Sequence, residues 1–362
     1  MSEERHIMRL HSLISPSEED LPQGSGLRVL IARLVQGENL ARHEAFELLD
    51  CLLDGAATDA QVAAGLIALS MKGETVDELI GIASAMRSRS VRIRTSHECF
   101  LDTAGTGSSA VKTFNVSTAA AFVIAGAGVA VAKHGNRAVT SRSGSSDVLT
   151  ALGVKINVSP EISEKCLNEI GVCFMFAPLY HPTTARVAAI RRELGVRTIF
   201  NLLGPLTNPA GAPYQAVGVS KAALIEPLAQ ALAALGSKRA WVLHGLDGLD
   251  EMTLAEKTLV AEASGGEVKT FTLDAADFGL RRASLEHLSC EDSQSSARVI
   301  QEIFHRDRHD AARDLVVANA AVGLFVAGKA EDLPAAAKLA AASIDDGAAA
   351  TKLAELVKAT NT

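Results

Sequence analysis

Polar segments punctuated by glycine interrupt an otherwise apolar sequence at three places, and the first has the composition of a phosphate-binding turn. Residues 102–118 read DTAGTGSSAVKTFNVST. If a strand enters the Gly-Thr-Gly turn and a helix begins near Val116, backbone amides and hydroxyl groups gather at a helix N-terminus, which attracts phosphate. Such turns also serve packing alone, and Ser117 and Thr118 are equally typical helix N-cap residues, so both interpretations stand.

The second segment, residues 133–147, reads KHGNRAVTSRSGSSD and follows an expected strand at residues 129–132. It places cations among hydroxyl residues and glycines at the carboxyl end of a strand, where open α/β sheets bind ligands. Taken singly, Lys133 could be a surface charge, His134 a hydrogen-bonded structural histidine and Asn136 a turn residue. Beside the first segment, the set favours a binding cleft.

The third segment, residues 244–253, reads HGLDGLDEMT and again follows an expected strand. Asp247, Asp250 and Glu251 offer carboxylate oxygens, which suit Mg²⁺ bridging to a polyphosphate; an acidic surface turn is the alternative. A further patch, residues 190–208, holds Arg191 and Arg192 before an expected Gly-Pro turn. Adjacent arginines on a helix point in different directions, so at most one should face a carboxylate or phosphate.

The elements that must position these segments follow from the hydrophobic pattern. Residues 27–90 have helical period with breaks at three glycines, which predicts four helices, and capping boxes pair Thr58 with Gln61 and Thr75 with Glu78. After residue 94, β-type runs alternate with helix-length stretches, which indicates a largely parallel sheet covered by helices. The expected strands are residues 99–103, 129–132, 172–176, 239–243 and 268–273; the main expected helices are residues 161–170, 221–235, 293–305, 311–327, 335–345 and 348–358.

Composition narrows the class of partner. The 362 residues are 48% hydrophobic and 21% charged, which excludes intrinsic disorder, and the formal net charge of −7 argues against a nucleic-acid or membrane surface as the default partner. The five cysteines form no CxxC pair, and the N-terminus has no apolar run of signal-peptide length. We therefore expect a cytoplasmic protein that binds small molecules.

The order and wording of these segments resemble the anthranilate phosphoribosyltransferases, a family within glycosyltransferase family 3 and the nucleoside phosphorylase class. The resemblance covers about residue 27 to the C-terminus. It rests on MKGET at residues 71–75, TFNVSTA at 113–119, VAKHGNR at 131–137, SGSSDVLTALGV at 143–154, RRELGVRTIFNLLGPLTNPA at 191–210 and HGLDGLDE at 244–251.

The resemblance implies an enzyme of tryptophan biosynthesis that transfers the phosphoribosyl group of phosphoribosyl pyrophosphate to the amine of anthranilate and releases pyrophosphate, with Mg²⁺ as cofactor. An aryl amine is already neutral at pH 7, which fits a sequence without an obvious nucleophile or obligatory base. The family also implies a homodimer formed through the helical domain.

The resemblance assigns site residues position by position. Ser117, Asp250 and Glu251 correspond to Mg²⁺ ligands, His134 to the residue against anthranilate and Arg191 to the partner of its carboxylate, whereas Arg192 is assigned to structure. The implied substrate-binding residues are Gly105, Gly107, Ser108, Ser109, Thr113, Asn115, Val116, Ser117, Thr118, Lys133, His134, Gly135, Asn136, Thr140, Ser145 and Arg191.

One departure from the family falls within the first loop. The family usually reads GTGGD where this chain reads GTGSS, so Ser108 adds a Cβ near the substrate and Ser109 removes a negative charge near pyrophosphate and metal. This change keeps one alternative open, a related phosphoribosyltransferase that acts on another aromatic amine or base. A second alternative is a non-catalytic relative that binds nucleic acid on the same fold, against which the acidic pI and the intact Asp250 and Glu251 argue.

These observations predict an α/β fold: a small N-terminal helical domain plus a large domain with a mostly parallel sheet flanked by helices. We expect a mobile tail at residues 1–22, a helical domain at residues 23–97, to which about residues 182–195 return, and an α/β domain at residues 98–362. The cleft between the two domains is the expected active site.

Overall fold

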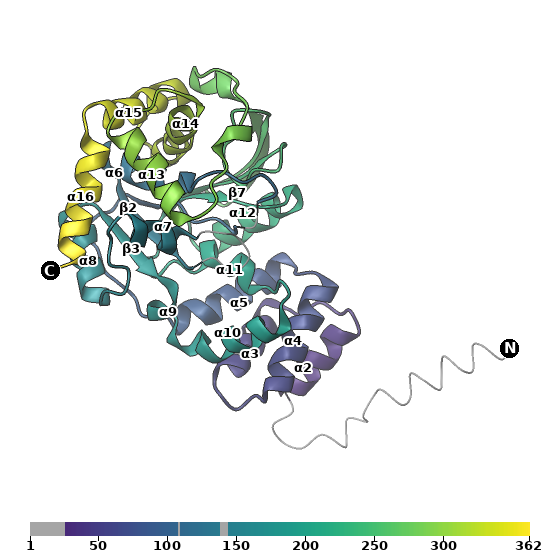
Figure 1. Cartoon of the computed structure of the whole chain (residues 1–362). Coiled ribbons are helices and arrows are strands. Elements are labelled where there is room, and N and C mark those ends of the chain that lie inside the picture. Colours follow the sequence, from purple (N-terminus) through teal and green to yellow (C-terminus); the bar gives the residue numbers. More distant parts are fainter. Residues whose placement is uncertain (1–25, 108, 138–143) are drawn as a thin grey trace, which may run out of the picture.

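The computed structural model describes residues 26–107, 109–137 and 144–362 and has a small helical domain beside a large α/β domain (Figure 1). The predicted fold class is therefore confirmed. The predicted tail at residues 1–22 lies outside the described residues, and the division of the chain between residues 97 and 98 stays a prediction.

Four helices form the N-terminal part of the helical domain, as the hydrophobic period predicts. Both predicted capping boxes are confirmed: the Thr58 and Thr75 side chains accept hydrogen bonds from the amides of Gln61 and Glu78. The helix α10 (Ala185–Leu194) packs against α3 and α4, so a segment from far along the chain completes this bundle. The four helices are α2 (Gly26–Val35), α3 (Arg42–Leu53), α4 (Asp59–Lys72) and α5 (Val76–Ser88).

A seven-stranded sheet forms the centre of the large domain, in the order β3-β2-β1-β4-β5-β6-β7. The pairs from β3 to β5 are parallel, and β6 and β7 continue the sheet antiparallel. Two of the seven strands, β4 and β6, were not expected from the sequence. The strands are β1 (Phe100–Asp102), β2 (Ala130–Gly135), β3 (Val172–Phe176), β4 (Tyr214–Gly218), β5 (Arg239–Gly245), β6 (Thr258–Ser264) and β7 (Glu267–Leu273).

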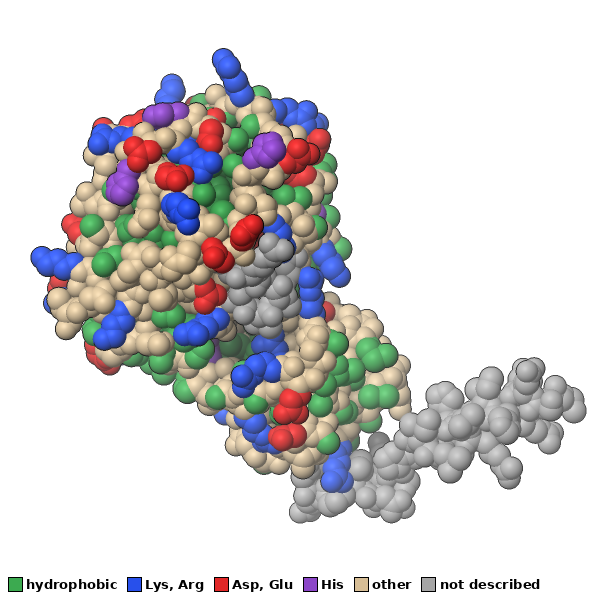
Figure 2. Space-filling model, in the orientation of Figure 1, with side chains coloured by type: hydrophobic (Ala, Val, Ile, Leu, Met, Phe, Trp, Pro, Cys, Tyr) green, Lys and Arg blue, Asp and Glu red, His purple; other side chains and the backbone are tan. Residues whose placement is uncertain are grey.

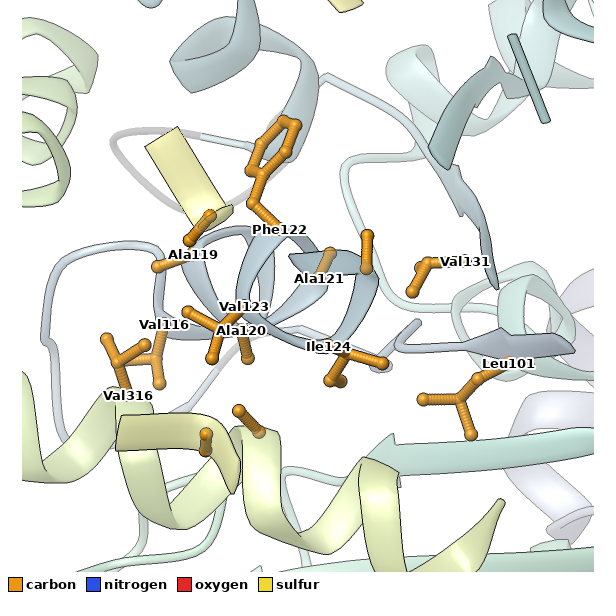
Figure 3. Close-up of a cluster of buried hydrophobic side chains, with 14 of the residues drawn as sticks. Leu101, Val116, Ala119, Ala120, Ala121, Phe122, Val123, Ile124, Val131 and Val316 are labelled. Carbon is orange, nitrogen blue, oxygen red and sulfur yellow. The ribbon is translucent and has the colours of Figure 1, made fainter. Parts of the chain in front are cut away.

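Helix α6 (Val116–Gly126) lies within the main core and is apolar on every side. Figure 3 shows its side chains between Leu101 and Val131 of the sheet and Val316 of α14 (Ala311–Val326). The two helices approach closely because Gly323 has no side chain, and a Cβ there would lie 2.5 Å from Ile124 Cδ1. The Asn115 side chain caps the start of α6, and Ser117 in the first turn is only partly buried.

The remaining helices cover the sheet or connect its strands. The short helix α11 (Phe200–Leu206) replaces the expected Gly-Pro turn, with Pro205 inside the helix near its end, so that prediction was wrong. None of the described helices combines the length and the apolarity needed to cross a bilayer. The others are α7 (Ser145–Ala151), α8 (Pro160–Glu169), α9 (Ala177–Tyr180), α12 (Ile225–Ala234), α13 (Ser293–Phe304), α15 (Leu333–Asp345) and α16 (Ala348–Thr360).

The strand order places a switch point at the centre of the sheet. From β1 the chain proceeds outward to β2 and β3, whereas β4 returns to the other side of β1 and proceeds to β5. Loops that leave the carboxyl ends of β1 and β4 therefore separate in opposite directions, and open α/β sheets bind ligands in the crevice that this leaves.

Candidate active site

A pocket of about 750 Å³ lies at the switch point and extends to the helical domain, where Met86 and α10 contribute to its wall. It brings together residues that are widely separated in the sequence. The sequence-predicted residues that line it are Gly105, Gly107, Ser109, Thr113, Asn115, Val116, Ser117, Lys133, His134, Gly135, Asn136, Ser145, Arg191, Asp250 and Glu251.

Three predicted residues are not among them. Ser108 and Thr140 lie outside the described residues. Thr118 does not line the pocket because it is fully buried within α6, where its amide donates to the Asn115 side chain at 3.1 Å. Asn115 is thus the N-cap of α6, and we leave Thr118 out of the proposed binding set.

The glycine-rich loop after β1 is held against the end of β4. The Thr106 amide donates to the Gly218 carbonyl at 2.9 Å, and Gly107 adopts a left-handed conformation with φ of 65°. The loop also contacts the acidic turn after β5: the Ser109 hydroxyl donates to the Gly248 carbonyl at 2.9 Å and accepts from the Asp250 amide at 3.2 Å. The structure therefore joins the first and third polar segments directly.

Lys133 is a buried cation, not a surface charge. Its ammonium donates to the Thr103 carbonyl at 2.8 Å, the Thr103 hydroxyl at 3.0 Å and the Ser117 hydroxyl at 3.4 Å. Burial lowers the pKa of Lys133, while the carboxylates of Asp102 and Glu251 oppose that shift. A positive charge is thus held at the floor of the pocket beside the helix N-terminus.

Asp250 and Glu251 form the acidic end of the pocket. Burial raises the pKa of both groups, and the Asp250 charge raises that of Glu251 further. The two carboxyl groups are therefore desolvated and, when both are ionised, repel each other. Ser117 lies beside Glu251 and lowers its pKa, which opposes part of the shift. In the described parts of the chain, no third His, Cys, Asp or Glu completes a metal-binding cluster with them.

These oxygen donors fit Mg²⁺, which takes one or two carboxylates and fills its remaining positions with water and substrate oxygens. Asp247, the third acid of the segment, is not among them. Its carboxylate accepts from the Thr253 hydroxyl at 2.6 Å and from the Leu249 amide at 3.0 Å, which shapes the turn that carries Asp250 and Glu251.

The opposite end of the pocket contains two neutral histidines. Burial lowers the pKa of His134 to about 4 and that of His181 to about 3, and the ring centroids lie 5.2 Å apart. His134 Nδ1 is 3.1 Å from the Gly204 carbonyl, which can only accept, so Nδ1 carries the proton and Nε2 is an acceptor. Sequence reasoning missed His181; its position just after the strand at residues 172–176 was the available signal.

Arg191 is the cation at this end. Its guanidinium donates to the Asn201 side chain at 3.2 Å and lies 5.0 Å from the Phe200 ring centroid. Among the described residues it has no acidic partner, whereas Arg192 is exposed and outside the pocket. One of the two adjacent arginines therefore faces the site, as the helix geometry predicts, and it is placed to pair with an anionic ligand.

Comparison with known proteins agrees with this geometry. Family models match the helical bundle domain of the glycosyl transferase family at residues 28–90 and its a/b domain at residues 97–350. The anthranilate phosphoribosyltransferase of Moorella thermoacetica is 49% identical over 91% of this chain and 97% of its own length, and that of Anaeromyxobacter dehalogenans is 50% identical over the same shares.

Solved structures show the same relationship. The anthranilate phosphoribosyltransferase of Thermus thermophilus has a TM-score of 0.86 at 38% identity, covering 92% of this chain and 99% of its own. The Saccharomyces cerevisiae enzyme, solved in complex with PRPP and Mg, has a TM-score of 0.85 at 26% identity, covering 94% and 99%. The chain therefore belongs to the anthranilate phosphoribosyltransferase family.

Proposed function

We propose that this chain transfers the phosphoribosyl group of phosphoribosyl pyrophosphate to the amine of anthranilate, with Mg²⁺, to give N-(5-phosphoribosyl)anthranilate and pyrophosphate. The observation that carries the proposal is one pocket with two desolvated carboxylates at one end and an arginine without an acidic partner at the other. These ends suit a metal-bound polyphosphate and an aromatic carboxylate, respectively.

The reaction forms a bond from the amine nitrogen to the anomeric carbon and breaks the bond from that carbon to the pyrophosphate oxygen, and the amine nitrogen gives up one proton to solvent or to the released pyrophosphate. The electron pair leaves with pyrophosphate, so negative charge grows on the leaving group and positive charge on the sugar. Bound Mg²⁺ would neutralise that leaving group, held by Asp250, Glu251 and Ser117. Lys133 and the amides of the glycine-rich loop add fixed positive charge and donors on the same side.

At the other end, Arg191 would pair with the anthranilate carboxylate and the His134 and His181 rings would pack on its aromatic ring. The neutral state of both histidines suits an apolar ring and leaves the carboxylate to the arginine. Positioning of the amine against the anomeric carbon then supplies most of the catalysis, because the nucleophile needs no strong base. A site between two domains also excludes water, which would otherwise hydrolyse the activated sugar.

The unusual GTGSS loop is compatible with this proposal. Ser109 stands where the family has an acid, and its hydroxyl both accepts from the Asp250 amide and donates to the Gly248 carbonyl. A carboxylate could do the first but not the second. The substitution thus holds the acidic turn in place while removing one negative charge from the pyrophosphate end.

We further propose a homodimer formed through the helical domain. Valines on α2 and a methionine on α4 expose apolar surface there, with Val35 64% and Met71 83% exposed, and Figure 2 shows hydrophobic side chains on the surface of this domain. Two packed helices that expose apolar side chains suit a self-complementary interface.

The free thiols of all five cysteines support a reducing, cytoplasmic location.

A pyrophosphate-release assay with a panel of acceptors tests the proposed reaction. Purified protein, Mg²⁺ and phosphoribosyl pyrophosphate are mixed with anthranilate, other aminobenzoates or nucleobases. We expect release that is fastest with anthranilate. Release with another acceptor and none with anthranilate would overturn the proposal in favour of a related transferase.

A further inference from the structure

Asp102 is a buried acid directly behind the pocket lining, between Thr103 and His134. It is the last residue of β1 and is fully buried. One carboxylate oxygen, Oδ2, accepts from Asn208 Nδ2 at 2.7 Å, and the other, Oδ1, accepts from the His134 amide at 3.3 Å. Burial raises its pKa to about 6, still below neutrality because Asn208, Lys133 and the His134 amide favour the ionised form.

Asn208 is satisfied at every polar atom of its side chain. Its Nδ2 donates to the Ala132 carbonyl at 2.9 Å as well as to Asp102, and its Oδ1 accepts from the Ala210 amide at 2.9 Å. Rotation of the amide by 180° would therefore lose all of these bonds. The orientation of the Asn208 amide is therefore fixed, and its NH₂ group needs the acceptor that Asp102 Oδ2 supplies.

The pair lies where the ladder between β1 and β2 stops. The register joins Phe100 to Ala130 and Leu101 to Val131 and goes no further, although β2 continues along β3 as far as Gly135. On the side of β2 that faces β1, the next backbone groups are the Ala132 carbonyl and the His134 amide. Buried backbone groups need partners, and these two receive them from Asn208 and Asp102.

The strands part here because β1 turns away into the glycine-rich loop, and this opening forms the pocket floor. The two residues of β2 that follow the last rung, Lys133 and His134, both line the pocket. Lys133 points across the opening to Thr103 and Ser117, while the His134 ring meets Gly204 and His181. The position of the β2 end thus determines both a phosphate-side cation and an aromatic-side ring.

We propose that Asp102 and Asn208 form a positioning pair that replaces the missing ladder between β1 and β2 and holds Lys133 and His134 at the pocket floor. This inference rests on the proposed function for its kinetic test. The Asp102 charge also favours the ionised form of Lys133, as does that of Glu251. A metal bound at Glu251 would leave Asp102 as the nearest counter-charge of that buried cation.

Exchanging the two side chains tests the pair. Asp102→Asn leaves one acceptor oxygen; the shorter bond, 2.7 Å to Asn208 against 3.3 Å to the His134 amide, keeps that oxygen, so the new NH₂ group faces the His134 amide. Asn208→Asp sets two carboxylates together and leaves the Ala132 carbonyl without a donor. We expect each single variant to lose roughly 10- to 100-fold in kcat/KM for both substrates, since small displacements of positioning groups cost that much. The double exchange restores one donor to one acceptor and should recover at least about 5-fold over the weaker single variant.

Hydrogen exchange gives a readout that does not depend on activity. In Asp102→Asn the His134 amide should exchange faster than in the wild type, while the Val131 amide, which donates to the Gly171 carbonyl on the other side of β2, should stay protected. If Asp102→Asn does not fold, Asn208→Ser carries the same measurement, because one hydroxyl cannot serve both Asp102 and Ala132 and the His134 amide should again exchange faster.

A matched control separates positioning from general stability. Gln215 on β4 is equally buried, donates to the Pro205 carbonyl at 2.7 Å and lies outside the pocket, so Gln215→Met should lower Tm without changing KM. Folded Asp102 and Asn208 variants with unchanged KM and kcat and an unchanged His134 amide would overturn the pair. If the wild type lacks activity, the proposed function fails, whereas the exchange measurement still decides this inference.

Discussion

Lys133 and Arg191 are both shielded cations of the pocket, but they differ in their partners. Lys133 donates to fixed acceptors on Thr103 and Ser117, and the charges of Asp102 and Glu251 raise its pKa against burial, whereas Arg191 has one amide oxygen and an aromatic ring. A cation whose ammonium is held by fixed hydrogen-bond acceptors contributes mainly to the local field, and one without an acid is free to bind an anion. The two residues should therefore respond differently to substitution.

Arg191→Ala should raise KM for anthranilate by roughly 10- to 100-fold, the cost of a lost charge-assisted hydrogen bond to the substrate carboxylate. KM for phosphoribosyl pyrophosphate should change little. Initial rates with each substrate varied in turn measure both constants. Arg192→Ala, one residue away but exposed, is the matched control and should resemble the wild type; equal effects of Arg191→Ala on both constants would contradict the assigned role.

Ser109→Ala should weaken the metal site, because it removes the hydroxyl that joins Gly248 to the Asp250 amide. Loss of two ordinary hydrogen bonds predicts an increase of about 3- to 10-fold in the Mg²⁺ concentration that gives half-maximal rate. Ser109→Thr keeps the hydroxyl and should stay near the wild type. Mn²⁺ binding measured by electron paramagnetic resonance tests the same loss of metal affinity without turnover. Equal Mn²⁺ affinity in Ser109→Ala and Ser109→Thr would contradict a role for the Ser109 hydroxyl in the metal site.

At the scale of elements, the turns that carry the acids are fixed by close backbone contact. A Cβ at Gly218, the last residue of β4, would overlap the Asp250 carbonyl. The carboxyl end of β4 therefore packs directly against the acidic turn that follows β5, so a shift of the turn would require a shift of β4. Any side chain at Gly218 is excluded because its Cβ would overlap the Asp250 carbonyl, whatever the chemistry of the rest of the side chain.

Gly218→Ala should consequently lower the free energy of unfolding by about 1–3 kcal/mol and reduce activity, because the Asp250 backbone must shift to admit the methyl group. Thermal unfolding and the initial rate measure the two effects. Gly65→Ala in α4 is the control, since its Cβ would make only ordinary contact with Leu52 at 3.5 Å and alanine favours helix. A Gly218→Ala protein as stable and active as the wild type would refute this coupling.

Local signals in the sequence were sufficient for elements whose ends are set locally. The hydroxyl-to-glutamine and hydroxyl-to-glutamate pairs at Thr58 and Thr75 define helix starts by themselves. The strand β4, YQAVG, is only five residues long, and the strand β6, TLVAEAS, has two β-branched residues among seven; their pairing with β1 and with β5 defines them as strands. The Gly-Pro pair at Pro205 predicted a turn because proline usually ends a helix. Here the surrounding packing accommodates it near the end of α11.

The same distinction applies to the candidate site. The four polar segments contain most of the residues that line the pocket, because three of them follow directly from the end of a strand. Contacts between segments could not be read in this way: the bond from Ser109 to Gly248, the pairing of Asp102 with Asn208 and the stacking of His181 on His134 join positions that only the folded chain brings together. Their roles in binding stay predictions.

At the scale of the whole molecule, the pocket depends on how the helical domain is attached. Arg87 of α5 crosses to the large domain, where it donates to the Leu206 carbonyl at 2.6 Å and the Leu235 carbonyl at 2.9 Å, at the ends of α11 and α12. Burial lowers its pKa to about 10, so it stays charged at neutral pH. A cation suits the C-terminal ends of two helices, whose dipoles leave partial negative charge there.

Arg87→Ala should therefore loosen the two domains, lowering Tm by several degrees and raising KM for both substrates, because the pocket wall comes from both domains. Small-angle scattering should show a broader distribution of shapes. Arg89→Ala is the control, since Arg89 pairs with Asp50 inside the helical domain and should leave KM unchanged. Unaltered scattering and kinetics in Arg87→Ala would show that the attachment depends on other contacts.

Anthranilate fluorescence gives the sharpest test of the proposed reaction, because its decay can be followed on mixing the protein with anthranilate, phosphoribosyl pyrophosphate and Mg²⁺. We expect loss of signal with the wild type, no loss when Mg²⁺ is chelated, and no loss with the Asp250→Ala, Glu251→Ala double variant. A wild type that leaves the fluorescence unchanged would contradict the proposed reaction, and a double variant as active as the wild type would contradict the metal site.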